Sequence, residues 1–271
     1  MATIKDVARE AGLTVGTVSR VLNNRGYISE ATRENVYRVM KELNYQPNEV
    51  ARSLSKSKTN TIGVIVPHIV HPYFAKLISN LEKAASDRGY KMLLCNSRED
   101  QNREQEYLDM LKSNRVAGLI LCSARVKTES LADLGIPVIT IERSVGAGTA
   151  SVECDNYQGG VMAAEHLIAC GCKYIINLGG VEQTKMPADS RETGFLDVCG
   201  RYGVTAIGKK SLEDEYYAME YHEYIEKIIM ENPQADGIFA SSDLLAAQVL
   251  QVCAKLGIRV PEQMKVVGFD D

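Results

Sequence analysis

Three polar side chains near the N-terminus have the chemistry needed to read DNA. Residues 13–24 read LTVGTVSRVLNN, in which apolar residues recur at the spacing of one helix face. The opposite face carries only small or polar side chains and ends in an arginine. Thr17 and Ser19 offer hydroxyl groups to phosphates or base edges, and Arg20 can bind guanine through two hydrogen bonds. This pattern predicts a short helix whose bare face can approach a DNA groove closely.

A second set of candidate residues lies at the ends of expected strands and helices further along the chain. Aromatic rings stack on sugar faces, and guanidinium and carboxylate groups bind sugar hydroxyls. The residues are His71, Tyr73 and Phe74 after the first strand, Arg143 after the fourth, Arg191 at the start of a helix and Asp270 at the end of the last strand. Their placement predicts a ligand cleft.

The motifs of common enzyme classes are missing from the sequence. It has no G-x-G-x-x-G after a strand, no phosphate-binding G-x-x-x-x-G-K-[ST] and no G-x-S-x-G. The seven cysteines form one close pair, Cys170 and Cys172, without a second pair or a histidine at ligand spacing. We expect free, buried thiols, no catalytic residues, no metal and no cofactor.

The first 46 residues predict a helix-turn-helix domain of three short helices. Thr3, Thr14 and Ser29 stand where N-caps are needed, and Gly12 suits the end of the first helix. The inner face of the third helix is expected to carry Val36, Met40 and Leu43. Residues 48–54 predict a two-turn helix that is too short to be stable alone, and residues 55–60 form a polar linker.

From residue 61 onward, apolar runs of strand length alternate with helical patterns. Strands are expected at 62–66, 91–95, 118–122, 138–141, 174–178, 237–240 and 266–269, and helices at 73–88, 101–113, 158–170, 191–202, 215–231 and 244–256. This alternation predicts an α/β fold with parallel sheets covered on both faces. In such sheets ligands bind beyond the carboxyl ends of the strands.

Charge is distributed unevenly along the chain. Residues 1–60 hold ten Lys and Arg against six Asp and Glu, whereas the whole chain holds 31 and 35. The basic excess of the first segment predicts that this part meets nucleic-acid phosphates. The N-terminus has no apolar leader and no apolar run approaches the length of a membrane span, so we expect a cytoplasmic protein with no membrane contact.

Motifs along almost the whole chain resemble the lactose-repressor family of bacterial transcription regulators. They are TIKDVAREAGLTVGTVSRVLNN, SEATRENV, LNYQPNEVARSLSKSKTNTIGVIVP, HPYF, ERSV, DNYQGG, SRETGF, SSDLLAAQ and VPEQMKVVGFDD. The resemblance implies a homodimer that binds double-stranded operator DNA. It also implies a periplasmic-binding-protein-like core of two doubly wound parallel-sheet subdomains that hold a sugar-type effector. The expected domains are 1–46 for DNA binding, 47–60 for hinge helix and linker, and 61–157 and 158–271 for the core subdomains.

The resemblance also assigns roles to individual residues. Base reading falls to Val15, Gly16 and Arg20, and Leu54 of the hinge helix matches a leucine that wedges into the minor groove. Further expected DNA contacts are Thr3, Thr14, Thr17, Ser19, Asn23, Tyr27 and Ala51. The expected effector contacts are His71, Tyr73, Phe74, Asp155, Arg143, Arg191, Ser242 and Asp270.

Departures from the family pattern bear on the effector. Pentose-binding relatives tend to carry Asn, Asp and Asn where this chain has His71, Glu142 and Ser242, which points away from ribose. A hexose, a disaccharide or a sugar phosphate remains open, and the lack of a second aromatic clamp in the sequence disfavours a nucleobase. Two other classes of protein remain as alternatives, a sugar-binding protein without a DNA role and an enzyme.

The sequence stops directly after the strand expected at 266–269. Members of the family continue beyond this point, so we expect an incomplete C-terminal subdomain with an exposed sheet edge.

Overall fold

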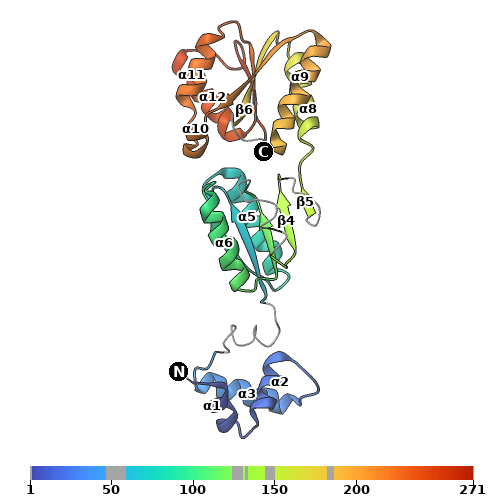
Figure 1. Ribbon diagram of the computed structural model, residues 1–271, viewed down its shortest axis with the longest axis vertical. Coiled ribbons are helices and arrows are strands. Elements are labelled where there is room, and N and C mark those ends of the chain that lie inside the picture. The colour runs from blue at the N-terminus through green and yellow to red at the C-terminus, as the bar shows by residue number, and fades with distance from the viewer. Residues whose placement is uncertain are drawn as a thin grey trace. The chain divides into compact units, whose positions relative to one another are not determined.

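The chain divides into two compact units, Met1–Thr59 and Asn60–Asp271 (Figure 1). The computed structural model describes residues 2–46, 59–123, 131, 134–143, 150–181 and 186–270. The expected hinge helix and most of the linker, including Ala51 and Leu54, lie outside the described residues.

The described part of the first unit contains the three predicted helices, α1 (Ile4–Glu10), α2 (Val15–Asn23) and α3 (Glu30–Glu42). The predicted caps are confirmed: Thr3 and Asp6 form a reciprocal capping box, Thr14 accepts from the backbone N–H of Thr17, and Ser29 begins α3 in the same way. Each cap satisfies backbone N–H groups that have no partner within the helix. The turn between α1 and α2 is therefore fixed by local chemistry.

Six small apolar side chains form the core of this unit: Val7, Ala8, Val18, Val21, Val36 and Val39. On α3 the buried pair is Val36 and Val39, while Met40 and Leu43, expected on the inner face, are only partly buried. Valines separated by three residues allow the three helices to pack closely. The opposite face of α2 does not contribute to this core.

The first sheet of the second unit has the order β2-β1-β3-β4-β5, with every described pair parallel. Its strands are β1 (Thr61–Val66), β2 (Lys91–Asn96), β3 (Gly118–Leu121), β4 (Val138–Ile141) and β5 (Ala150–Val152). Helix α5 (Pro72–Ser86) packs on the face of Val64 and Val66, and α6 (Gln101–Ser113) packs on the face of Ile65. Alternate residues of β1 thus enter opposite cores.

The second sheet has the order β7-β6-β8-β9 and is also parallel. Its strands are β6 (Tyr174–Val181), β7 (Thr205–Ser211), β8 (Gly237–Ala240) and β9 (Lys265–Val267). On one face lie α8 (Asn156–Ala169) and α9 (Ser190–Tyr202), and on the other lie α11 (His222–Glu231) and α12 (Asp243–Leu256) (Figure 1). Both sheets are doubly wound, as predicted.

Three features of this unit differ from the sequence-based expectation. Strands β5 and β7 were not expected, and the helix expected over 215–231 is two helices, α10 (Glu213–Ala218) and α11. Met219 breaks them apart with a left-handed backbone conformation, φ 55°. Cys154 and Cys170 are exposed, contrary to expectation, whereas the other five free cysteines are buried.

Helices α8 and α9 approach each other through two glycines. A Cβ at Gly160 would lie 1.9 Å from the carbonyl oxygen of Arg191, and one at Gly194 would lie 2.2 Å from that of Tyr157. Both obstacles are backbone atoms, which cannot rotate away. The position of Arg191 therefore depends on a glycine in the neighbouring helix.

We expect Gly160→Ala to destabilise the protein by about 3 kcal/mol, because the added methyl group forces α8 and α9 apart. Urea unfolding followed by circular dichroism measures this change. Gly200→Ala on α9 is the matched control, since a Cβ there meets nothing within 4 Å. In that open position alanine is expected to stabilise the helix by up to about 1 kcal/mol. Equal midpoints for both variants would contradict the close approach.

Within the described ranges, no helix is long and apolar enough to cross a membrane. No group of three or more His, Cys, Asp or Glu side chains that could hold a metal ion is found among the same residues.

Candidate functional site

A cavity lies in the second unit where strands of both sheets end. Its lining includes Pro67 after β1, Ser123 after β3, Glu142 after β4, Gly179 and Gly180 in β6, Ser211 of β7, Ser241 after β8 and Asp270 after β9. This is the edge where parallel α/β sheets bind ligands. The rule applied to the sequence therefore locates the cavity.

Seven of the eight residues expected to contact an effector line this cavity: His71, Tyr73, Phe74, Arg143, Arg191, Ser242 and Asp270. The eighth, Asp155, lines a neighbouring cavity together with Glu142 and Arg143. Its side chain accepts from the backbone N–H of Gln158 at 3.0 Å and so caps α8. The structure thus brings seven of these residues together and uses Asp155 locally.

Arg191 is the most enclosed charge of the cavity, with 8% of its surface exposed. Its Nε donates to Oδ1 of Asn156 at 2.7 Å, and its Nη1 donates to the carbonyl oxygen of Ser241 at 2.7 Å. The guanidinium carbon lies 3.6 Å from the centre of the Phe269 ring. Burial lowers the pKa of Arg191, and Asp270 opposes that shift. The guanidinium plane is therefore fixed by hydrogen bonds on two sides and a ring below.

The carboxyl group of Asp270 interacts electrostatically with the guanidinium group of Arg191. Burial raises its pKa to about 6, although Arg191 acts to lower it; Asp243 and Glu142 add to the rise. Desolvation disfavours the charged form of an acid, and the nearby positive charge offsets only part of that penalty. Asp270 therefore changes its charge close to neutral pH.

A polar chain connects the first sheet with Arg191. Glu142, which follows β4 with φ 52°, accepts from the backbone N–H of Cys154 at 2.6 Å and from Nδ2 of Asn156 at 2.9 Å. Asn156 in turn accepts from Arg191. The sequence did not single out Asn156, because an asparagine at a helix start is read first as a capping residue. Its amide bridges Glu142 and Arg191 and so couples the orientation of the carboxylate to that of the guanidinium group.

Arg143, the second arginine of the cavity, donates from Nη1 to the carbonyl oxygen of Ser123 at 2.6 Å. Burial lowers its pKa, and Glu104 and Glu99 act in the opposite direction. The cavity thus has two oriented guanidinium groups, each with acidic neighbours.

Aromatic side chains line the cavity on the α5 side. The rings of Tyr73 and Phe74 meet edge to face with centres 5.1 Å apart, and His71 lies 5.7 Å from Phe74. Burial raises the pKa of Tyr73 to about 12 and lowers that of His71, so both are neutral at pH 7. Nδ1 of His71 is buried and has no hydrogen-bond partner among the described residues. A ligand hydroxyl would satisfy it.

Three further aromatic residues line the cavity from the second sheet's side: Tyr216, Tyr221 and Tyr224. The sequence did not indicate them, because its helical pattern predicts one continuous helix that carries all three. The break after α10 instead turns them into the lining. These side chains remove the sequence-based argument against a nucleobase, which assumed that a second aromatic clamp is missing.

In the first unit, the face of α2 that was expected to read DNA is free. Thr14, Val15, Gly16 and Arg20 are exposed, while Thr17 and Ser19 are half-buried. A Cβ at Gly16 would make only an ordinary contact, 3.7 Å from Oγ1 of Thr14, so the fold of this unit does not require a glycine there.

The remaining expected DNA contacts lie around this face or outside the described residues. Thr3 is exposed at the start of α1, and Tyr27 is 96% exposed in the loop after α2. Asn23 donates from Nδ2 to the carbonyl oxygen of Ser19 at 2.8 Å, which ties it to its own helix. Ala51 and Leu54 belong to the undescribed segment. Thr3, Asn23 and Tyr27 do not belong to the apolar core of the unit.

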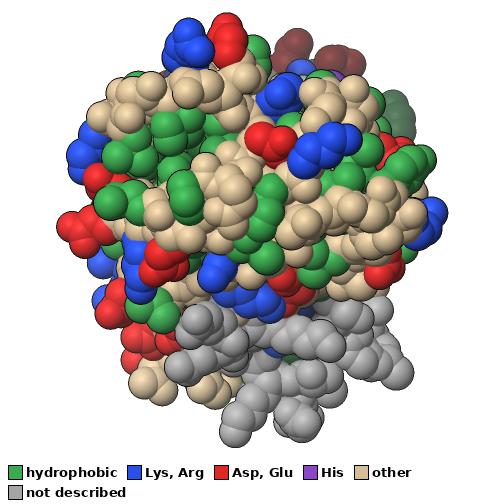
Figure 2. Space-filling view, turned by 90° about the horizontal axis from the view of Figure 1, so that it is seen from above, with side chains coloured by type: hydrophobic (Ala, Val, Ile, Leu, Met, Phe, Trp, Pro, Cys, Tyr) green, Lys and Arg blue, Asp and Glu red, His purple; other side chains and the backbone are tan. Residues whose placement is uncertain are grey.

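Acidic and basic side chains are mixed on the face shown in Figure 2, where they surround groups of hydrophobic side chains. Mixed charge of this kind gives no continuous basic surface for phosphates. Residues 1–60, by contrast, carry an excess of basic side chains.

Comparisons with known proteins agree with this architecture. Residues 3–48 match the family model for bacterial regulatory proteins of the lacI family, and residues 59–271 match that for periplasmic binding proteins and the sugar binding domain of the LacI family. The chain is 37% identical over 270 residues to the ribose operon repressor of Halalkalibacterium halodurans, covering 100% of this chain and 80% of the relative. It is 39% identical to the sucrose operon repressor of Pediococcus pentosaceus, covering 98% and 81%.

Solved structures show the same likeness. The crystal structure of the lac repressor dimer bound to operator and the anti-inducer ONPF has a TM-score of 0.85 at 25% identity, covering 100% of this chain and 82% of that chain. The complex of the transcriptional regulator CelR with cellobiose has a TM-score of 0.67 at 28% identity, covering 100% and 83%. The helix-turn-helix unit, the two parallel sheets and these matches lead to one conclusion. The chain belongs to the LacI family of bacterial transcription regulators, whose members are DNA-binding proteins and not enzymes.

Proposed function

We propose that this protein is a homodimeric repressor of a sugar-utilisation operon, acting in the cytoplasm, whose affinity for operator DNA is controlled by a sugar-type effector. The observation that carries the proposal is the cavity in which oriented arginines, a titratable carboxyl group and aromatic rings meet at the carboxyl ends of parallel strands. Relatives named for ribose, sucrose and cellobiose support the class of effector.

On the DNA side, α2 enters the major groove, with Arg20 as the principal base reader. Val15 contacts a thymine methyl group, Gly16 permits the approach, and the hydroxyls of Thr14, Thr17 and Ser19 lie near phosphates. Thr3, Asn23 and Tyr27 hold the domain on the backbone. Ala51 and Leu54 belong to a hinge helix that folds on the minor groove, where Leu54 opens a base step.

On the effector side, Arg191 and Asp270 bind hydroxyl groups of the ligand, and Arg143 binds a further polar group. Tyr73 and Phe74 cover one face of the sugar ring, and Tyr216, Tyr221 and Tyr224 cover another. His71 offers its buried nitrogen, and Ser242 at the start of α12 offers its hydroxyl. Asp155 keeps an indirect role, because it caps the helix that carries Asn156.

The effector controls DNA binding by favouring one closure of the two halves of the core. Only a difference in affinity between two states shifts their populations, so the ligand must contact both halves differently in each. Hydrogen bonds from Glu142 through Asn156 to Arg191 join those halves, and both Glu142 and Arg191 line the cavity. Effector contact with Arg191 therefore has a direct route to the first sheet.

The protonation of Asp270 predicts a pH dependence of effector binding. Sugar hydroxyls donate to a carboxylate, so the ligand binds the ionised form more tightly and lowers its pKa. With a pKa of about 6 in the free protein, affinity is expected to fall by up to tenfold per pH unit below about pH 6 and to level off above about pH 7. Isothermal titration calorimetry at several pH values measures this. Asp270→Asn is expected to bind weakly at every pH, and a slope retained in that variant would assign the titration to another group.

The function is tested by a thermal-shift screen of sugars and sugar phosphates, followed by gel shift with a duplex selected by the protein from a random library. A hit that raises the melting temperature and changes duplex affinity supports the proposal. A sugar that binds while no duplex is bound at low salt would instead favour a sugar-binding protein without a DNA role.

A further inference from the structure

The break between α10 and α11 lies among residues that line the cavity, because Tyr216 precedes it and Tyr221 and Tyr224 follow it. Met219 adopts a left-handed conformation, and Tyr221 begins α11 without a side-chain cap. The backbone N–H groups of Met219 and Glu220 bond to carbonyl oxygens of α10, whereas the N–H of Tyr221 and the carbonyl oxygen of Met219 have no partner within either helix. Something outside the two helices must satisfy them.

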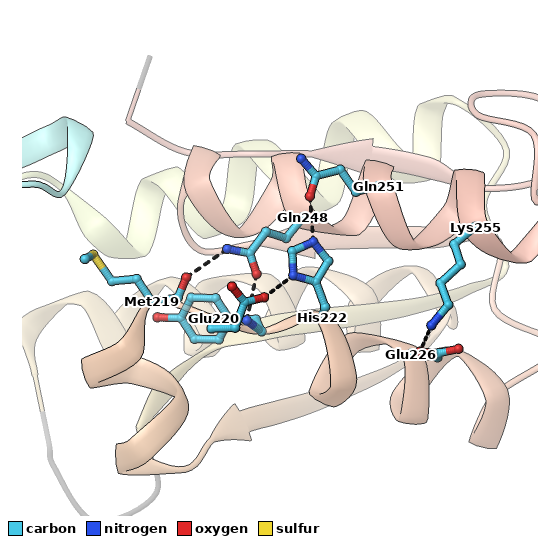
Figure 3. Close-up of polar contacts among 8 residues, drawn as sticks. Met219, Glu220, His222, Glu226, Gln248, Gln251 and Lys255 are labelled. Carbon is cyan, nitrogen blue, oxygen red and sulfur yellow. Dashed lines mark hydrogen bonds and ion pairs between the residues drawn. The ribbon is translucent and has the colours of Figure 1, made fainter.

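Gln248 on α12 supplies both missing hydrogen bonds (Figure 3). Its Oε1 accepts from the backbone N–H of Tyr221 at 2.7 Å, and its Nε2 donates to the carbonyl oxygen of Met219 at 2.9 Å. One partner is a donor and the other an acceptor, so the amide can satisfy both in one orientation only. With 7% of its surface exposed, Gln248 makes these bonds away from solvent.

Of the two residues that Gln248 bonds, Tyr221 lines the cavity, whereas Met219 and Gln248 itself do not. Tyr221, which receives one of the two bonds, is 8% exposed and contributes to the lining. Tyr216 lies on α10 before the break and Tyr224 on α11 after it, so the geometry of the break sets the relative positions of all three rings. We call these three residues the tyrosine wall.

We propose that Gln248 is a positioning residue of the effector site, which acts by holding the break that places the tyrosine wall. This inference rests on the proposed function of the cavity. It adds a determinant of effector affinity that touches neither the ligand nor the cavity. Alternatively, Gln248 could serve only the stability of α12, and the test must separate the two roles.

A second link between the break and α12 provides the matched control. His222 lies between Glu220 and Gln251, with Nε2 2.6 Å from Oε1 of Gln251 (Figure 3). Gln251 lies one turn after Gln248, but it is exposed and bonds a side chain instead of the backbone. Gln251→Glu keeps a side-chain oxygen for His222 and adds the same negative charge one turn away, while both backbone bonds of Gln248 remain.

The decisive variant is Gln248→Glu, which keeps the shape of the side chain. A protonated carboxyl group donates to Met219 and accepts from Tyr221, as the amide does. The ionised form loses the donor and places negative charge against a carbonyl oxygen. Burial favours the neutral form, so the pKa of the new carboxyl group is expected above its ordinary value. The variant should therefore regain its function as the pH falls.

Effector affinity relative to wild type is the first measurement, by calorimetry with D-ribose, sucrose and cellobiose as probes. Gln248→Glu is expected to bind about tenfold more weakly at about pH 8 and to approach wild type at about pH 5. Comparison with wild type at each pH removes the contributions of Asp270 and of the groups around the break, Glu215, Glu220, Tyr221 and His222. Gln248→Asn, whose shorter amide cannot span both partners, should bind weakly at every pH. Gln251→Glu should stay close to wild type throughout.

Hydrogen–deuterium exchange of the peptide 213–224 is the second measurement and needs no ligand. At about pH 8, Gln248→Glu should lose protection in this peptide while the rest of the chain keeps it. If wild type binds none of the probes, the effector is none of these three sugars, and exchange alone decides the role of Gln248. Unchanged protection, or an affinity loss that is the same at both pH values, would overturn the proposal.

Discussion

Replacing Arg20 by alanine is expected to weaken specific operator binding by at least about 30-fold while leaving the protein folded. A bidentate contact with guanine contributes about 1–3 kcal/mol of discrimination, and a homodimer loses it in both half-sites, so the total is about 2–6 kcal/mol. Arg20 is exposed on α2 and lies outside the apolar core of the unit, so the unfolding transition should not change. Fluorescence anisotropy with the duplex selected by the wild-type protein measures the affinity.

The control for Arg20 must remove the same charge without removing the same contact. Arg38 on α3 is exposed and pairs with Glu42 at 2.7 Å, so Arg38→Ala changes the charge of the unit equally. Loss of charge alone weakens binding to every duplex and lowers the salt dependence of affinity. Arg20→Ala should instead lose most of its preference for the selected duplex over a scrambled one. Equal losses in the two variants would reduce Arg20 to an electrostatic role.

The fold was predictable wherever local chemistry decided the outcome. The caps Thr3, Thr14 and Ser29 could be recognised as polar side chains that precede an apolar helical pattern. Central strands such as β1 and β8 could be recognised as unbroken apolar runs. Strands β5 and β7 lie at sheet edges, where one side of the strand lacks a partner and polar residues are tolerated. β7 reads TAIGKKS, in which no apolar run survives. The missing apolar run explains both omissions, since β5 reads only ASV, whereas the edge strands β2 and β9 retain apolar runs and were expected.

The site was predictable in part for a similar reason. Arg143 and Asp270 follow strands, and the rule that ligands bind at the carboxyl ends of parallel strands places them together. The tyrosine wall follows no strand. It depends on the break at Met219, where neither glycine nor proline marks a turn, and on Gln248, which is 27 residues away from Tyr221 in the sequence. Gly160 and Asn156 depend likewise on a helix approach that only packing reveals.

Arg191→Lys is expected to weaken effector binding by about 10- to 100-fold although the positive charge remains. Lysine carries one ammonium group at the end of a flexible chain, whereas the guanidinium bonds Asn156 and Ser241 in two directions while lying on Phe269. Lost hydrogen bonds to a charged group contribute about 1.5–3 kcal/mol, which corresponds to that range. Calorimetry with a sugar identified in the thermal-shift screen measures it. Arg201→Lys, on the exposed end of the same helix, is the control.

Arg191→Met removes the positive charge, and its effect on the pH dependence of stability reports on the interaction between Arg191 and Asp270. In Arg191→Met the carboxyl group loses the cation that lowers its pKa, so this pKa should rise above about 6. An acid with a pKa higher in the folded state than in the unfolded state destabilises the fold at high pH, where it must ionise, and not at low pH. Urea unfolding should therefore show a larger deficit relative to wild type at about pH 8 than at about pH 5. The double variant Arg191→Met with Asp270→Asn should remove this pH dependence. A deficit that does not change with pH would mean that Arg191 supports the fold through Asn156 and Ser241 alone, and that Asp270 owes its raised pKa to burial without restraint from the arginine.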